Sequence, residues 1–323
     1  MKRIRNVFLL AVVVFCCVTG PAQGAEALAI ATSVSGEAKV QGSGSGELLP
    51  VSVGQPFFHK DVIYTFAGGR VSLLFSDGSI YSIHPESRLS LDRAPGAGKN
   101  TMLSSLAGKL GGGLKDMFTE AGKQEALTAV PGFRKPATQK EGAEKVRILY
   151  PRNGMIMEKR PQFLWRGPAG GVTVSLTLKE PLGKVWSLTS DRQTVSYPSD
   201  HPGLIPGNTY FLKIESQTGA AGTEEVYFSL LQDREIQEIQ DLANQLQADR
   251  DKHPRDTTAT VLLIELFAGK RLFHQALAEL DRIQHDASMR IYALQKKRKI
   301  YHEIGLWEEW EKAGKGLQAA GRP

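Results

Sequence analysis

The sequence predicts a multidomain protein of β plus α structure: an N-terminal all-β domain, a β-sandwich and a C-terminal helical hairpin repeat. Residues 25–93 and 146–231 contain short runs of alternating apolar and polar residues between glycine-containing turns, as half-buried strands do. Residues 232–323 instead repeat apolar side chains every three or four positions, which is the period of a helix. A chain of 323 residues, 41% of them hydrophobic, is long enough for two or three domains.

Residues 1–24 have the layout of a cleaved secretory signal. A basic head precedes an apolar run, Val7 to Val18, that is shorter than the roughly 20 residues of a membrane-spanning helix. Small residues at Ala22 and Gly24 suit a signal peptidase, so we expect cleavage between Gly24 and Ala25 or one residue later. The alternative is an uncleaved N-terminal anchor. We expect a periplasmic or secreted protein with no stable membrane span after processing.

Cleavage changes what the composition implies. The whole chain has a formal charge of +6, but loss of Lys2, Arg3 and Arg5 leaves +3, so we expect no nucleic-acid partner. Both cysteines, Cys16 and Cys17, leave with the signal. The mature chain is therefore expected to lack disulfides, thiolate metal sites and a cysteine nucleophile.

Residues 25–93 predict an all-β domain. Residues 71–76 alternate as a half-buried strand, Asp77-Gly78 supplies the positive φ angles of a tight hairpin, and residues 80–83 form the returning strand. Residues 62–65 and 89–91 predict neighbouring strands. Further turns are expected at glycines, namely Gly36, Gly54, Gly68, Gly69 and the loop Gly42–Gly46.

Five stretches of this domain carry a family resemblance. They are Val34–Val40, Val53–Pro56, Lys60–Thr65, Gly69–Ser79 and Ser87–Leu91. In order and spacing they resemble a FecR-type domain, which implies an all-β fold in the bacterial cell envelope. Some such proteins relay receptor occupancy to a cytoplasmic sigma factor. Because six residues precede the only apolar run, we do not expect that role here.

Residues 94–145 are rich in glycine, alanine and lysine and predict a linker. Within it, apolar side chains recur at helical spacing, which favours a short amphipathic helix: Leu103, Leu106, Leu110, Leu114, Met117 and Phe118. Glycines at 108 and 111–113 weaken this helix. It either lies on the β domain or docks on a membrane or a partner. Farther on, Thr128–Arg134 resembles a later FecR-family strand and would extend the first domain.

Residues 146–231 predict a second β domain. Strands are expected at 161–165, 172–178, 185–188, 210–214 and 226–230, and short strands at this spacing suggest a sandwich.

One turn of this second domain carries a further resemblance. The segment Leu204–Tyr210 resembles the turn into a late strand of a fibronectin type III or other immunoglobulin-like module, here without a disulfide. Trp165 is either a core residue or a platform for a ligand.

Residues 232–323 predict five helices. Gly269 and Gly305 each follow an apolar helix and are 36 residues apart, close to the 34 of a tetratricopeptide unit. Gly305–Trp310 resembles the turn of such a unit, whereas Gly269 comes two residues too early for the same register. The resemblance covers two units at most.

No catalytic motif stands out in the chain. It has no HExxH, no G-x-S-x-G and no phosphate-binding loop, and its seven histidines are scattered. We therefore predict no catalytic, cofactor-binding or metal-binding residue, no cofactor and no enzyme. The prediction is an exported scaffold or interaction protein of the cell envelope that binds a protein partner. The alternative is a glycan-binding or glycan-processing protein whose active site uses unassigned acids.

The candidate partner-binding residues lie in the helical block. They are a basic run and two tryptophans: Lys296, Lys297, Arg298, Lys299, Trp307 and Trp310. Tryptophan and arginine are enriched where interfaces carry their binding energy. The other interpretations are a solvated helix face for the basic run and a shared core position for the tryptophans.

Overall fold

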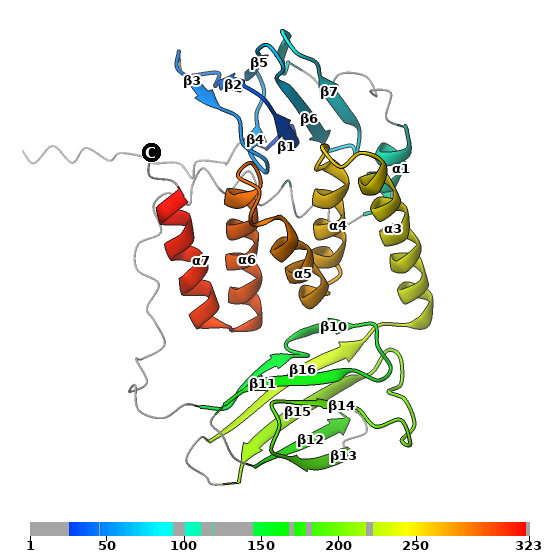
Figure 1. The fold of residues 1–323 in the computed structure, drawn as a ribbon. Helices are drawn as coiled ribbons and strands as arrows, with labels where there is room; N and C mark the ends of the chain where they lie inside the picture. The colour runs from blue at the N-terminus through cyan, green and yellow to red at the C-terminus, as the bar shows by residue number, and fades with distance from the viewer. Residues whose placement is uncertain are drawn as a thin grey trace, which may run out of the picture.

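The structure is a computed structural model that describes residues 26–44, 46–92, 101–110, 118, 145–167, 171–178, 183–217 and 222–320. The signal sequence 1–24, its cleavage site and most of the 94–145 linker, including Thr128–Arg134, lie outside the described residues. Antiparallel sheets fill the N-terminal part and helices the C-terminal part, so the predicted mixed fold class is confirmed. Figure 1 shows two β units at opposite ends of a layer of helices.

The first β unit is built from two four-stranded sheets, ordered β4-β1-β6-β7 and β3-β2-β5-β8. Their facing side chains, among them Phe57, Ile63 and Phe75, form one core. The strands are β1 (Ala29–Ser35), β2 (Ala38–Gln41), β3 (Leu48–Pro50), β4 (Pro56–Phe57), β5 (Val62–Thr65), β6 (Arg70–Phe75), β7 (Ile80–Ile83) and β8 (Arg88–Ser90).

The predicted β6–β7 hairpin is confirmed. Gly78 has a φ of +84°, and its N–H donates to the carbonyl oxygen of Phe75 at 2.9 Å. Gly36, Gly54 and Gly68 also have positive φ angles, as their turns require.

The prediction that β6 is half-buried is wrong, because both of its faces are covered. Leu73 belongs to the core between the two sheets, whereas Leu74 belongs to a core shared with the helices. The same division places Ala31 of β1 in the first core and Ile30 in the second. The sheet β4-β1-β6-β7 is therefore a middle layer, packed on a sheet on one side and on helices on the other.

The second β unit is a sandwich. A five-stranded sheet, β10-β16-β15-β12-β13, packs on a three-stranded sheet, β14-β11-β9. Trp165 is a core residue of this sandwich, 3% exposed. The strands are β9 (Arg147–Tyr150), β10 (Gly154–Ile156), β11 (Gln162–Arg166), β12 (Val172–Leu178), β13 (Gly183–Ser190), β14 (Thr194–Ser196), β15 (Thr209–Ser216) and β16 (Thr223–Leu230).

The turn into β15 is fixed by its tyrosine. Gly207 has a φ of +82°, and the Tyr210 hydroxyl accepts a hydrogen bond from the backbone N–H of Ile205 at 2.8 Å. Strands β9, β10 and β14 were not predicted. Each is only three or four residues long, and such short segments carry too little alternation to be recognised.

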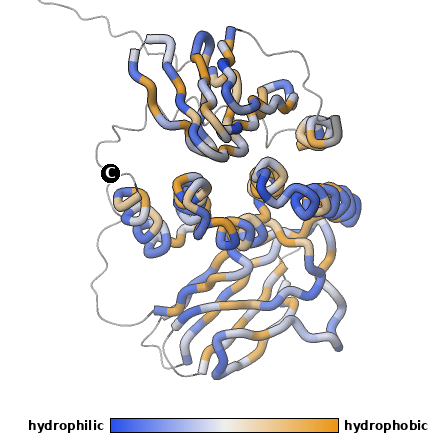
Figure 2. Tube along the Cα trace, turned by 45° about the horizontal axis from the view of Figure 1, so that its top comes forward, coloured by the Kyte–Doolittle hydropathy of each residue, from blue (hydrophilic) through white to orange (hydrophobic). Residues whose placement is uncertain are grey.

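The five predicted C-terminal helices are confirmed. In α4 every residue from Thr258 to Phe267 is buried, whereas α3, at the right of the layer in Figure 2, is mostly hydrophilic. The helices are α1 (Thr101–Lys109), α3 (Asp233–Lys252), α4 (Thr258–Gly269), α5 (Phe273–Ile283), α6 (Arg290–Ile304) and α7 (Trp307–Ala320).

The two helical hairpins turn in the same way. After α6, Gly305 has a φ of +74°, and the N–H of Leu306 donates to the Tyr301 carbonyl at 2.8 Å. After α4, the left-handed residue is Arg271, with a φ of +57°, and the N–H of Leu272 donates to the Phe267 carbonyl at 2.8 Å. Arg271, and not Gly269, is thus the counterpart of Gly305. The two positions are 34 residues apart, the period of a tetratricopeptide unit.

The largest hydrophobic core crosses the boundaries between the predicted blocks. It joins Ile30 and Leu74 of the first β unit, Leu103 and Leu106 of α1, and the buried faces of α3 to α6. The predicted amphipathic helix therefore lies on the first β unit and on the helical layer. At the same junction the Thr32 and Thr258 hydroxyls are hydrogen-bonded at 2.9 Å. The helices and the first β unit thus share one core.

We expect Gly54→Ala to destabilise the protein by about 2 kcal/mol or more. Gly54 has a positive φ, and a Cβ there would lie 2.7 Å from Cδ2 of Tyr292 in α6. Urea unfolding measures the loss. Gly44→Ala is the control, because a Cβ at Gly44 meets no atom within 4 Å. Equal stability of the two variants would contradict the close contact between the β unit and α6.

We expect a fragment of residues 25–231 to keep a folded sandwich and a destabilised first β unit. The buried core of the sandwich is formed by its own residues, with only Ile236 of α3 packed against it, whereas removal of the helices exposes Ile30 and Leu74. Trp165 and Trp186 report on the sandwich by fluorescence, and circular dichroism reports on both units. We expect two transitions in urea. The first, unfolding of the first β unit, changes the circular dichroism but not the tryptophan fluorescence. A single transition seen by both probes would contradict the shared core.

Candidate functional site

The first half of the predicted basic run is buried in ion pairs. The Nζ of Lys296 donates to Oε2 of Glu265 at 2.6 Å, and the Tyr292 hydroxyl donates to Oε1 of the same carboxylate at 2.9 Å. The Glu265 side chain is 4% exposed. Burial raises the pKa of Tyr292, and the neighbouring Glu265 carboxylate adds to this shift. Lys296 therefore ties α6 to α4.

Lys297 has a similar role toward α5. Its Nζ donates to the Asp281 carboxylate and to the side-chain oxygen of Gln284, and the residue is only 5% exposed. The interpretation of Lys296 and Lys297 as a solvated helix face is wrong, because both side chains fold back onto neighbouring helices.

The second half of the run lies at the surface. The Arg298 guanidinium stacks over the ring of Trp310 at 4.5 Å, and Nζ of Lys299 lies 3.8 Å from the Glu303 carboxylate one turn later. Arg298 thereby joins α6 to α7 through a cation–π contact.

The two tryptophans form one aromatic cluster at the end of the helical layer. Their ring centroids are 6.3 Å apart, and the ring of His302 lies edge-on to Trp307 at 5.2 Å. Trp307 is 39% exposed, whereas Trp310 is half-buried under Arg298. We call His302, Trp307, Trp310 and Arg298 the aromatic cluster. It is the part of the predicted partner site that the structure brings together at the surface.

The usual groove of a helical-hairpin array is not open along α4. Partners of such arrays lie along the first helices of successive hairpins, which here are α4 and α6. Because Thr258–Phe267 are all buried within the chain, α4 offers no such surface. A partner of the helical block cannot lie along α4 in the usual way.

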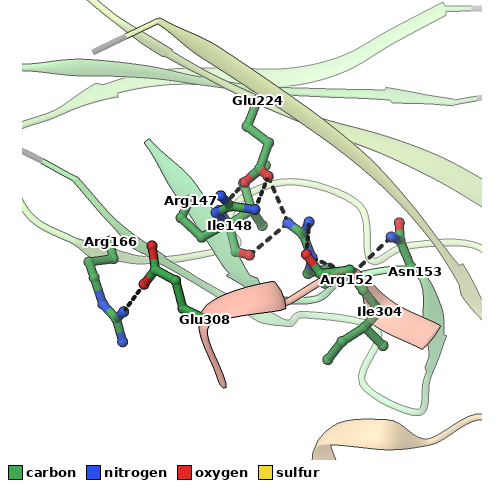
Figure 3. Close-up of polar contacts among 9 residues, drawn as sticks. Arg147, Ile148, Arg152, Asn153, Arg166, Glu224, Ile304 and Glu308 are labelled. Atoms are coloured by element: carbon green, nitrogen blue, oxygen red, sulfur yellow. Dashed lines mark hydrogen bonds and ion pairs between the residues drawn. The ribbon is translucent and has the colours of Figure 1, made fainter. Parts of the chain in front are cut away.

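Arg152, on the loop between β9 and β10, joins the sandwich to the end of α6 (Figure 3). Its Nε donates to the Ile304 carbonyl, its Nη2 donates to that of Gly305 at 3.4 Å, and its Nη1 lies 3.1 Å from the Glu224 carboxylate. Nδ2 of Asn153 donates to Ile304 as well, at 3.2 Å. These donors satisfy carbonyls that the helix leaves free, and a cation is favourable at this negative end.

The same loop holds the other hairpin turn. The N–H of Met155 donates to the Arg271 carbonyl at 2.9 Å, and Nη2 of Arg271 donates to the Asn153 carbonyl at 3.1 Å. One short segment, residues 152–155, which ends the β9–β10 loop and begins β10, therefore contacts both hairpin turns. Sequence reasoning missed this loop, because nothing in a four-residue segment shows which distant carbonyls it will meet.

Two further contacts reinforce this junction. The Tyr150 ring packs on His274 of α5 at 4.4 Å, and its hydroxyl donates to Glu158 at 2.8 Å. Burial raises the pKa of Tyr150. On the α7 side, Nη1 of Arg166 lies 3.3 Å from the Glu309 carboxylate, beside the aromatic cluster.

Outside these contacts, the sandwich has an open depression of about 400 Å³ between β13 and β14, lined by side chains that include Arg192 and Leu188 but no carboxylate. Within the described residues, no three His, Cys, Asp or Glu side chains gather as metal ligands. In the same part of the chain, no helix is both long and apolar enough to cross a membrane.

No protein-family model and no curated protein sequence matches the chain. Among solved structures, it is similar to a "Cell surface anchoring domain", with 27% identity over 23% of this chain and 97% of that one and a TM-score of 0.21. It is also similar to the β-glucuronidase of Faecalibacterium prausnitzii, with 16% identity over 65% of this chain and 35% of that one and a TM-score of 0.20. Such TM-scores do not establish a common fold.

We expect Arg152→Met to destabilise the protein by roughly 3 kcal/mol, because it removes the buried cation paired with Glu224 and the guanidinium donors to the Ile304 and Gly305 carbonyls. Arg147→Met is the control. Arg147 pairs with the same carboxylate, but its side chain is 33% exposed against 7% for Arg152, so its loss should cost less than about 1 kcal/mol. Urea unfolding checks both, and equal losses would contradict the role of Arg152 at the junction.

Proposed function

We propose that this protein is an exported, non-enzymatic scaffold of the bacterial cell envelope that binds a protein partner at the outer end of its helical layer. The observation that carries the proposal is the aromatic cluster. Trp307 is a large exposed aromatic in the same cluster as Arg298, and α7 lies at the edge of the helical layer in Figure 1. Tryptophan and arginine are enriched at binding hot spots.

The envelope location is supported by the layout of the first 24 residues and by the FecR resemblance of residues 34–91. The sandwich supports the immunoglobulin-like interpretation. Its first, third and sixth strands, β9, β11 and β14, share one sheet, and its long strands β12, β15 and β16 share the other. The hydrogen bond that the Tyr210 hydroxyl accepts from the backbone just before its strand is also typical of this architecture.

The alternative, a glycan-processing protein, has less support. Glycoside hydrolysis uses two carboxyl groups placed on either side of the scissile bond. The depression between β13 and β14 has no carboxylate in its lining. The buried carboxylates of the helical block, such as Glu265 and Glu279, are engaged by Lys296 and by Arg250 in ion pairs that join helices.

The test is a photo-crosslinking residue introduced at Trp307 in the full chain expressed in its own cell envelope. We expect a crosslinked band that contains one predominant protein. The control is the same residue at Tyr227, which is similarly exposed, at 42%, but lies on the sandwich. Equal crosslinking at the two positions, or crosslinking at Tyr227 alone, would show that the helical end is not the partner surface.

A further inference from the structure

The two sheets of the sandwich are unequal, and the larger one extends past the smaller. β13 is the last strand of the five-stranded sheet, and β14 is the last strand of the three-stranded one. Leu188 of β13 lies on the same side as Trp186, since side chains alternate along a strand. Trp186 is 7% exposed and stacks on Phe163, whereas Leu188 is 41% exposed. Leu188 therefore faces the place where a fourth strand of the small sheet would lie.

The edge of β14 next to this place is free to pair. Val195 of β14 lies opposite Phe163 of β11. On either side of this pair, the Trp165 N–H donates to the Gln193 carbonyl and the Tyr197 N–H donates to the Pro161 carbonyl. Residues 193, 195 and 197 therefore direct their backbone groups toward β11. Backbone N–H and C=O groups alternate in direction along an antiparallel strand. The N–H and C=O groups of Thr194 and Ser196 therefore point away from β11. Both residues line the depression. An unpaired edge is a template for an added strand.

The charge of the depression selects its occupant. The Arg192 guanidinium has no ion pair or hydrogen bond with any residue the structure describes, and only its backbone N–H is engaged, by Ser190. No carboxylate lines the depression, and its other polar side chains are neutral. An arginine in a water-exposed hollow of this kind favours a carboxylate of the ligand.

We propose that this hollow binds an extended acidic peptide of another protein. The peptide adds a strand to the free edge of β14, places an apolar side chain over Leu188, and pairs a carboxylate with Arg192. In such strand addition, backbone hydrogen bonds supply affinity and pockets for alternate side chains supply specificity. The volume of about 400 Å³ is at the small end of ligand sites and suits a few side chains. β13 is the strand of its sheet farthest from the helices (Figure 1), so the site is independent of the aromatic cluster.

The experiment uses the mature full chain and a capped, fluorescent nine-residue peptide in which valine alternates with glutamate. We expect saturable binding by anisotropy, and slower hydrogen exchange of residues 193–197 when the peptide is present. Arg192→Glu should weaken binding at least tenfold. Thr194→Pro, which removes an outward N–H that the ladder with β11 does not use, should do the same. The control is Arg234→Glu on α3, a side chain 90% exposed, which should change binding less than twofold.

Several results would overturn the proposal. One is equal binding by Arg192→Glu and Arg234→Glu, and another is equal binding of a peptide with lysine in place of glutamate. Displacement of the peptide by a glucuronate oligosaccharide, or a dimer of the protein that Arg192→Glu abolishes, would assign the hollow to a sugar or to a second copy instead. None of these outcomes affects crosslinking at Trp307, so the two surfaces are tested separately.

Discussion

The sheet β4-β1-β6-β7 has two apolar faces, and the need to cover both determines how this molecule is built. One face packs on the second sheet of the first β unit. The other, which includes Ile30 and Leu74, has to be covered by something else, because burial of each such side chain stabilises the fold by roughly 1.5–3 kcal/mol. The helices supply that cover, together with α1. The first β unit and the C-terminal helices consequently fold around one core, although the linker and the whole sandwich lie between them in the sequence.

The sandwich is attached differently. Its buried core is made of its own residues, with Ile236 of α3 packed against it. It meets the helices through apolar contacts of Leu149, Met155 and Met157 as well as through polar groups. The loop 152–155 donates to, and accepts from, the two hairpin turns at Arg271 and Gly305. Because these turns are equivalent positions of a 34-residue repeat, one short loop can hold both. A shared apolar core on one side, and polar contacts with a few apolar side chains on the other, keep the helical layer between its two β neighbours.

This arrangement decides which surfaces are available. The inner helices are occupied by the chain itself, and Lys296 and Lys297 are used to hold them together. What stays open lies at the margins: the aromatic cluster on the last hairpin and the hollow at the far edge of the sandwich. Within the described residues, both lie at the edge of a layer: α7 at the edge of the helices, and β13 and β14 at the edges of their sheets.

The sequence by itself determined the local elements. A period of two residues predicted the longer strands but not β9, β10 and β14, a period near 3.6 predicted the five C-terminal helices, and Asp77-Gly78 predicted a hairpin. Each of these signals depends on residues close together in the chain. It determined only part of the candidate site. The exposure of Trp307 and the ion pairs of Lys296 and Lys297 could not be predicted. The sequence of a basic run does not show whether its side chains contact water or a carboxylate such as Glu265, which is 31 positions from Lys296. Likewise, the two-sided burial of β6 and the use of Arg271 as a left-handed turn depend on contacts made far along the chain. Tertiary structure alone decided these features, because burial and charge pairing follow from what the folded chain brings together.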